Sequence, residues 1–317
     1  DYANGLAVFF DSTATNKTVE ITGADVTPQS VVFDSGDYIL QGTNTIAGAA
    51  PLTVATDATL KLGSSNVLPD GVGTGNITVN GILDLNGNSD TINALAGSGF
   101  VENTLATTTS TLSVGAGAGG SFPGSLSSSF GTLALLKTGP TDFALSGNNT
   151  YDGATTIQQN RLFISSAAAF SPNTAVTVHN EATFVLNAAG TPAFSQSIVL
   201  NTGANLSMRQ AATLSNVTLP TAGSVKFNFD DVTTQALTLA SDLALDGSLN
   251  VQIGGGTGTP QCRQGGNARP GKIFGRVFPD VEQACARSGP PDRKTDAKGA
   301  AGWVYHPPSG GLKPAIR

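Results

Sequence analysis

Carboxylates and one histidine are the residues whose types and spacing could do chemistry in this sequence. Asp230 and Asp231 adjoin, and His179 precedes Glu181 by two positions. A glycoside hydrolase needs two carboxylates that converge on one bond, and a lyase needs carboxylates for Ca²⁺ beside a basic Lys or Arg. Because side chains alternate along a strand, Asp230 and Asp231 would converge only in a turn, whereas His179 and Glu181 would share a strand face. We expect the aspartates to form a solvated corner and the second pair to form a surface contact.

Other chemical motifs are equally weak. Gly115–Gly120 is rich in glycine but precedes neither a Lys nor a helix, so we interpret it as a loop and not as a phosphate cradle. His306 stands beside Pro307 without an evident partner, and no His or Cys set has metal-ligand spacing. The basic residues before position 255 lie outside any dense acidic cluster; they are Lys17, Lys61, Lys137, Arg161, Arg209 and Lys226. We therefore expect no catalytic, cofactor-binding or metal-binding residues, and no enzyme.

Composition and charge restrict the class of protein. Charged residues make up only 12% of the 317 residues, and glycine is abundant at 39. Residues 1–254 contain 18 Asp and Glu against 6 Lys and Arg, whereas residues 255–317 contain 4 against 10. An acidic, sparsely charged body argues against a nucleic-acid partner, whose phosphates require clustered Lys and Arg. No apolar run is long enough for a transmembrane helix, and the thiol-free body favours an extracellular location.

The elements that would position any site are short, repeated strands. Alternating apolar pairs recur with an offset of about eight residues, or six in one case, and Gly, Asn, Asp or Ala separates the members. The paired positions are Leu52 and Val54 with Leu60 and Leu62, Ile77 and Val79 with Leu83 and Leu85, Val176 and Val178 with Phe184 and Leu186, and Ile198 and Leu200 with Leu206 and Met208. One such unit cannot bury its apolar side alone, but stacked units enclose a continuous interior. The sequence therefore predicts an all-β solenoid with rungs of about 20 to 25 residues, in preference to a sandwich or a propeller.

One segment carries a family resemblance. It is Leu136-Lys137-Thr138-Gly139-Pro140-Thr141-Asp142-Phe143-Ala144-Leu145-Ser146-Gly147-Asn148-Asn149-Thr150-Tyr151-Asp152-Gly153-Ala154-Thr155-Thr156-Ile157. This segment resembles the autotransporter-associated β-strand repeat, except that Thr141-Asp142 and Asn160-Arg161 replace two glycines of the pattern. Two degenerate units, at 82–99 and 7–38, extend the similarity over most of residues 1–254. We expect Asn148, Asn149 and Gly153 to occupy corners that require positive φ, and Tyr151 to pack in a corner.

The resemblance implies a right-handed parallel β-helix, the passenger region of an autotransporter, displayed on or released from a bacterial outer surface. We expect the role of a rigid stalk or spacer at the cell surface. The sequence leaves open whether this stalk also adheres to host or environmental glycans or proteins. The implied partner is a β-barrel translocator, which we do not find in this chain. The alternative is a carbohydrate-active β-helix enzyme, either a polysaccharide lyase or a glycoside hydrolase. A cleft lined by converging carboxylates with a Lys or Arg would favour that alternative.

The repeat pattern stops after Gly254. Residues 255–317 hold eight of the 16 prolines, both cysteines (Cys262 and Cys285) and Trp303. We expect this tail to be irregular or disordered, and we favour an out-of-frame reading over a genuine linker closed by a Cys262–Cys285 disulfide. Because the chain begins at Asp1, without a start Met or a signal peptide, we expect a mature product or a fragment.

Overall fold

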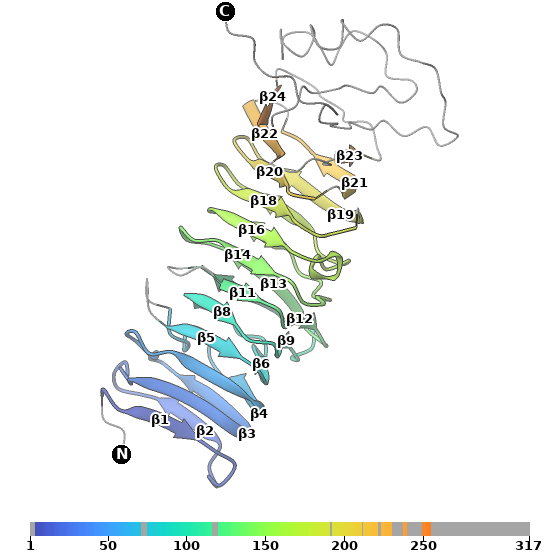
Figure 1. Ribbon diagram of the computed structural model, residues 1–317. Helices are drawn as coiled ribbons and strands as arrows, with labels where there is room; N and C mark the ends of the chain where they lie inside the picture. The colour runs from blue at the N-terminus through green and yellow to red at the C-terminus, as the bar shows by residue number, and fades with distance from the viewer. Residues whose placement is uncertain are drawn as a thin grey trace, which may run out of the picture.

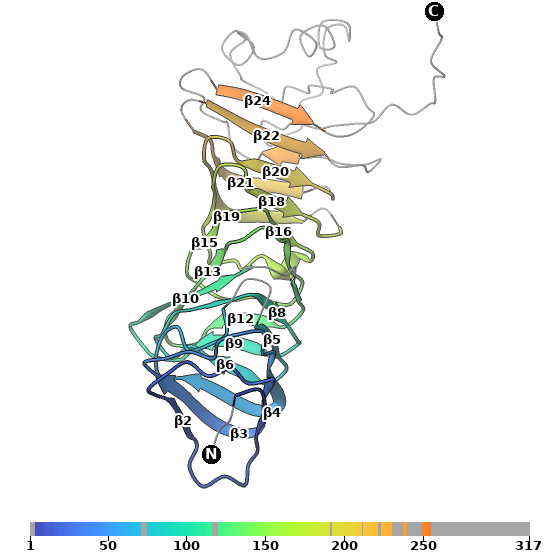
Figure 2. The ribbon, with the colours of Figure 1, turned by 90° about the vertical axis from the view of Figure 1, so that its left-hand side faces the viewer.

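The strands of the protein stack one above another along a single axis. The structure is a computed structural model, and it describes residues 4–70, 75–115, 120–190, 192–210, 212–220, 223–229, 237–239 and 249–254. Figure 1 shows the stack running from β1 near the N-terminus to β24, and Figure 2 shows the same order from the side. The predicted all-β, parallel β-helix is confirmed for these residues. The tail, residues 255–317, lies outside them.

Three parallel sheets form the walls of the solenoid. The first sheet contains β1 (Ala7–Phe10), β2 (Thr18–Ile21), β3 (Ser30–Gly42), β4 (Leu52–Leu62), β5 (Asn76–Val79), β6 (Ile82–Asp84), β8 (Ala94–Ala96), β9 (Phe100–Asn103) and β12 (Ser125–Ser128). The second contains β7 (Asp90–Ile92), β10 (Thr109–Val114), β13 (Thr132–Lys137), β15 (Thr155–Ile157), β17 (Val176–Val178), β19 (Ala193–Leu200), β21 (Ala212–Thr218) and β23 (Leu237–Leu239). The third contains β11 (Gly120–Phe122), β14 (Phe143–Leu145), β16 (Arg161–Ile164), β18 (Thr183–Leu186), β20 (Asn205–Met208), β22 (Gly223–Phe229) and β24 (Leu249–Gly254).

The register of these sheets follows the apolar pairs in the sequence. Val176 pairs with Ile198, and Phe184 pairs with Leu206, so equivalent residues of successive rungs are stacked. Leu52 likewise pairs with Ile77. All sixteen predicted interior positions are at most 1% exposed. Stacking one rung on the next removes apolar side chains from water, and this burial stabilises the fold by about 25 cal/mol per Å² of apolar surface. A single rung cannot bury its apolar side in this way.

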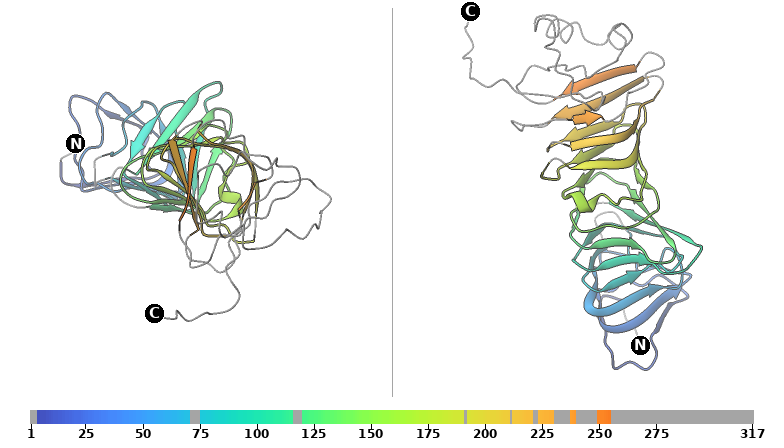
Figure 3. Two further views of the ribbon diagram at one scale, coloured as in Figure 1. Left: turned by 90° about the horizontal axis from the view of Figure 1, so that it is seen from above. Right: turned by 90° about the vertical axis from the view of Figure 1, so that its right-hand side faces the viewer.

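Some corners between the sheets contain residues whose backbone has the left-handed conformation, with positive φ. In the first sheet, β3 and β4 run through the corner as long strands, and their register shifts between Phe33 and Ser35. At the later corners the chain turns at Glu181, with φ of 62°, and at Gly203, with φ of 80°. Figure 3 shows from above that the strands surround one interior, with the N-terminal rungs displaced to one side.

Helix is a minor component of the described chain. One 3₁₀ turn, η1 (Ala167–Ala169), is capped by the Ser166 side chain, which accepts a hydrogen bond from the Ala169 N–H. Among the described residues, no helix has the length and apolar character that crossing a membrane requires. The interior thus consists of side chains from short strands, and the polar groups gather at the corners.

Candidate functional site

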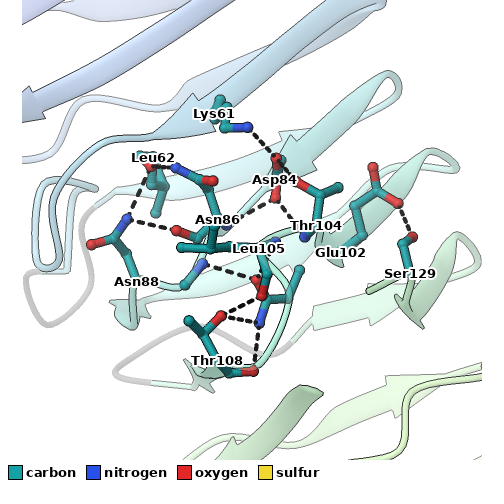
Figure 4. Close-up of polar contacts among 12 residues, drawn as sticks. Lys61, Leu62, Asp84, Asn86, Asn88, Glu102, Thr104, Leu105, Thr108 and Ser129 are labelled. Carbon is teal, nitrogen blue, oxygen red and sulfur yellow. Dashed lines mark hydrogen bonds and ion pairs between the residues drawn. The ribbon is translucent and has the colours of Figure 1, made fainter. Parts of the chain in front are cut away.

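The densest polar cluster lies at the corner that follows β6, where three successive rungs meet (Figure 4). Lys61, Asp84 and Glu102 are register neighbours in β4, β6 and β9. The Lys61 Nζ lies 3.5 Å from Asp84 Oδ2. Two carboxylates beside a lysine are the groups that a carbohydrate-active enzyme needs. The sequence did not indicate this column, because its members are each separated by a whole rung along the chain.

The carboxylate of Asp84, however, accepts hydrogen bonds from residues of the corner itself. Its Oδ1 accepts hydrogen bonds from the N–H of Asn86 at 2.8 Å and of Thr104 at 3.1 Å, and its Oδ2 accepts one from Thr104 Oγ1 at 2.6 Å. The residue is 3% exposed. Glu102 in turn accepts a hydrogen bond from Ser129 Oγ at 2.6 Å. Because its oxygens already bind donors of the chain, Asp84 joins two rungs and is closed to a substrate.

Asn103, which is fully buried beside this cluster, has the same linking role. Its Oδ1 accepts from the N–H of Gly87 at 2.8 Å and of Leu105 at 3.2 Å, while its Nδ2 donates to the carbonyls of Thr108 and Thr132. A buried amide normally uses its donors and acceptors within the protein. Asn103 therefore connects three consecutive rungs. Nothing in the sequence singles this asparagine out from its exposed neighbours.

Asp90 is a second buried carboxylate, at the start of β7. Its Oδ2 accepts from the N–H of Val67 at 2.9 Å and of Leu68 at 3.2 Å, and its Oδ1 accepts from the N–H of Thr91. Burial raises the pKa of Asp90 to about 7, with a smaller contribution from the Asp70 charge, against the lowering effect of the three N–H donors. Asp90 is 2% exposed. Its carboxylate thus accepts hydrogen bonds from the backbone of Val67 and Leu68, which lie outside any strand.

Lys137, the basic residue of the family-like segment, points into the solenoid at the end of β13. Its Nζ donates to the carbonyls of Thr138, Gly139 and Gln159. Burial lowers the pKa of Lys137 to about 8, although the Asp142 charge opposes that shift. The ammonium thus binds turn carbonyls of its own rung and of the next one.

Two further polar residues of the family-like segment, Asn149 and Tyr151, are also bonded inside the stack. Asn149 accepts from the Leu126 N–H at 2.8 Å and donates to the Ala169 carbonyl at 2.8 Å. The prediction that Tyr151 packs in a corner is confirmed, because Tyr151 is 1% exposed and its hydroxyl lies 2.6 Å from Thr155 Oγ1.

The expectation of positive φ at Asn148, Asn149 and Gly153 was wrong, since none of the three is left-handed. Gly153 is required instead by close approach, because a Cβ there would lie 2.3 Å from the Leu133 carbonyl oxygen. Asn160 is the residue with φ of 54°, where the family pattern has a glycine. Asparagine tolerates this conformation better than most residues.

The other residues considered for chemistry do not form a site in the described chain. His179 and Glu181 do not lie on one strand, as their spacing suggested, because the segment turns there and the Ala182 N–H bonds to the His179 carbonyl. Gly115 has φ of 115°, and a Cβ there would lie 2.3 Å from the Thr138 carbonyl oxygen. Residues 116–119 of the glycine-rich segment lie outside the described residues. Asp230, Asp231 and His306 lie outside the described residues.

A modest hollow of about 360 Å³ lies beside η1. Its walls come from segments 148–150, 167–172 and 193–196, and none of the lining residues is ionisable. Within the described ranges, no group of three His, Cys, Asp or Glu side chains could hold a metal ion. The polar groups that the structure does bring together thus serve mainly to bind rung to rung.

Comparison of the chain with protein-family models, with curated proteins and with solved structures finds no match. The likeness to the autotransporter-associated repeat therefore depends on the segment at 136–157 and its two degenerate copies.

Proposed function

We propose that this protein is a structural stalk, the passenger region of an autotransporter-type protein, displayed at or released from a bacterial outer surface and without enzymatic activity. One observation carries the proposal: Lys137 and Asn149 of the family-like segment are buried and bind successive rungs, and the Tyr151 hydroxyl is bonded within its own rung. Lys137, Asn149 and Tyr151 all have their polar atoms bound inside the stack. A chain that uses its polar groups in this way is suited to keep a fixed, extended shape.

A test of this function is the labelling of intact cells. Antibodies raised against the folded body are applied to unpermeabilised cells that express the full gene, and a periplasmic protein serves as the control for leakage. We expect labelling without permeabilisation, and we expect small-angle scattering of the purified chain to give an elongated particle. Labelling that appears only after permeabilisation would reject the surface location, and a compact particle would reject the stalk.

A second candidate function, a carbohydrate-active enzyme, is favoured by the placement of Lys61, Asp84 and Glu102 in one column of the first sheet, but the hydrogen bonds that enclose Asp84 count against it. Its carboxylates are adjacent across rungs, as general acid–base chemistry on a sugar requires. The test is the release of reducing ends or unsaturated products from acidic polysaccharides by the wild type and by Asp84→Asn and Glu102→Gln. Activity that both substitutions abolish would establish the enzyme and displace the stalk.

A further inference from the structure

Three of the six basic residues before position 255 lie on or directly after strands of the third sheet. Arg161 and Phe163 alternate on β16 with the interior residues Leu162 and Ile164, so they point outward. Arg161 is followed in the same outward column by Thr183, Asn205 and Lys226. We call Arg161, Phe163, Arg209 and Lys226 the basic face.

Two arginines of the basic face meet on one aromatic ring. The Cζ atoms of Arg161 and Arg209 lie 5.3 Å and 5.0 Å from the centre of the Phe163 ring. Such a contact holds a guanidinium in place while its edge remains free to donate hydrogen bonds. Arg209 comes directly after β20, so its side chain reaches back along the axis to β16.

The three cations of the basic face differ in whether a described carboxylate pairs with them. Arg161 is already paired with Asp142 through two hydrogen bonds, of 2.9 Å from Nε and 2.6 Å from its terminal nitrogen. Arg209 and Lys226 form no ion pair with any residue that the structure describes. Glu181, in the turn before β18, is an exposed carboxylate near this column. Among the described residues, Arg209 and Lys226 are thus cations without a carboxylate partner.

We propose that the basic face binds an extended anionic polysaccharide, one with sulfate or carboxylate groups, that lies along the axis of the solenoid. Arg161 and Lys226 are three rungs apart, which corresponds to about 14 Å at the usual strand spacing. Thr183 and Asn205 lie between them and offer a hydroxyl and an amide to sugar hydroxyls. The fork of a guanidinium matches sulfate and carboxylate oxygens. The choice of a polysaccharide over a nucleic acid rests on the proposed surface location.

The test is the binding of dextran sulfate to the purified full-length chain, measured by calorimetry at low salt. Because the tail adds ten basic residues, the comparison is made among variants that all keep the tail. The double variant Arg209→Gln/Lys226→Gln should weaken binding about three- to tenfold. Asp142→Asn, which removes the carboxylate paired with Arg161, should strengthen it. The control Lys17→Gln, a lysine that packs on Tyr38 near the N-terminal end of the stack, should leave it unchanged. Hydrogen exchange should slow along β16–β22 when dextran sulfate is added.

Equal affinity of the wild type and the double variant would overturn the proposal, as would an equal loss in the Lys17→Gln control. Binding of uncharged dextran at the same strength would contradict the role of charge. Tighter binding of single-stranded DNA than of dextran sulfate would assign the face to nucleic acid instead. These results are obtained on purified protein, so they are distinguishable from a failure of surface labelling, which concerns the stalk.

Discussion

The buried carboxyl group of Asp90 should make the stability of the solenoid depend on pH. Asp90 is 2% exposed, and burial raises its pKa to about 7, whereas the unfolded chain should titrate near the ordinary value of 3.8. The folded state therefore holds this proton more tightly than the unfolded state does. Stability is highest below the unfolded pKa, falls as pH rises from about 4 to about 7, and is constant above that.

The size of this effect follows from the shift in pKa. A difference of about three units corresponds to about 4 kcal/mol in full, of which about 3 kcal/mol falls between pH 5 and pH 8.5. Asp90→Asn removes this titration and keeps an acceptor for the N–H groups of Val67 and Leu68. The assay is urea unfolding of both proteins at the two pH values, followed by circular dichroism. The wild type should lose about 3 kcal/mol more than the variant as the pH rises.

The comparison with Asp90→Asn isolates this group, because all other carboxylates are common to both proteins. A wild type and a variant whose stabilities change in parallel between the two pH values would refute the reasoning. A wild type that gains stability relative to the variant would show that the three N–H donors outweigh burial, so that the pKa of Asp90 is lowered.

Three further substitutions test the packing, the hydrogen bonding and the backbone conformation of the corners, each by the urea midpoint. Gly153→Ala should destabilise by more than about 2 kcal/mol, because its Cβ would meet the Leu133 carbonyl, and a neutral result would contradict that close approach. Tyr151→Phe should cost about 1 kcal/mol, since it removes the hydroxyl beside Thr155, and a gain in stability would contradict the bond. Asn160→Val should cost about 1 to 2 kcal/mol because its φ is 54°, and Asn160→Gly clearly less; the reverse order would contradict the strain.

The interior of the solenoid could be predicted from the sequence because strand periodicity and rung length are both local signals. Leu52, Leu60 and their equivalents alternate with polar residues, and alternation alone determines which side chains point inward. The offset between paired strands recurs from unit to unit, so the units were expected to stack. The register was not predicted residue by residue; in the structure Val178 pairs with Leu200, its equivalent in the next rung.

The polar corners could not be predicted in the same way. The column of Lys61, Asp84 and Glu102 forms because the two successive rungs are 23 and 18 residues long. These lengths depend on loops, and the conformation of a loop is not determined by its neighbours in the sequence alone. Asp90 and Asn103 are buried because they satisfy backbone groups of other rungs. Gly153 was correctly placed at a corner, but the reason is contact with the rung below it and not its own φ.

The most direct test of the surface stalk uses two adjacent residues on β17. Thr177 points outward, whereas Val178 is fully buried, and residues 1–254 contain no cysteine. In a chain with Cys262→Ser and Cys285→Ser, Thr177→Cys and Val178→Cys are each exposed on intact cells to a maleimide that cannot cross membranes. The account predicts rapid labelling of Thr177→Cys, and labelling of Val178→Cys only after denaturation. Equal protection of both on intact cells, or equal labelling of both, would contradict a folded solenoid at the cell surface.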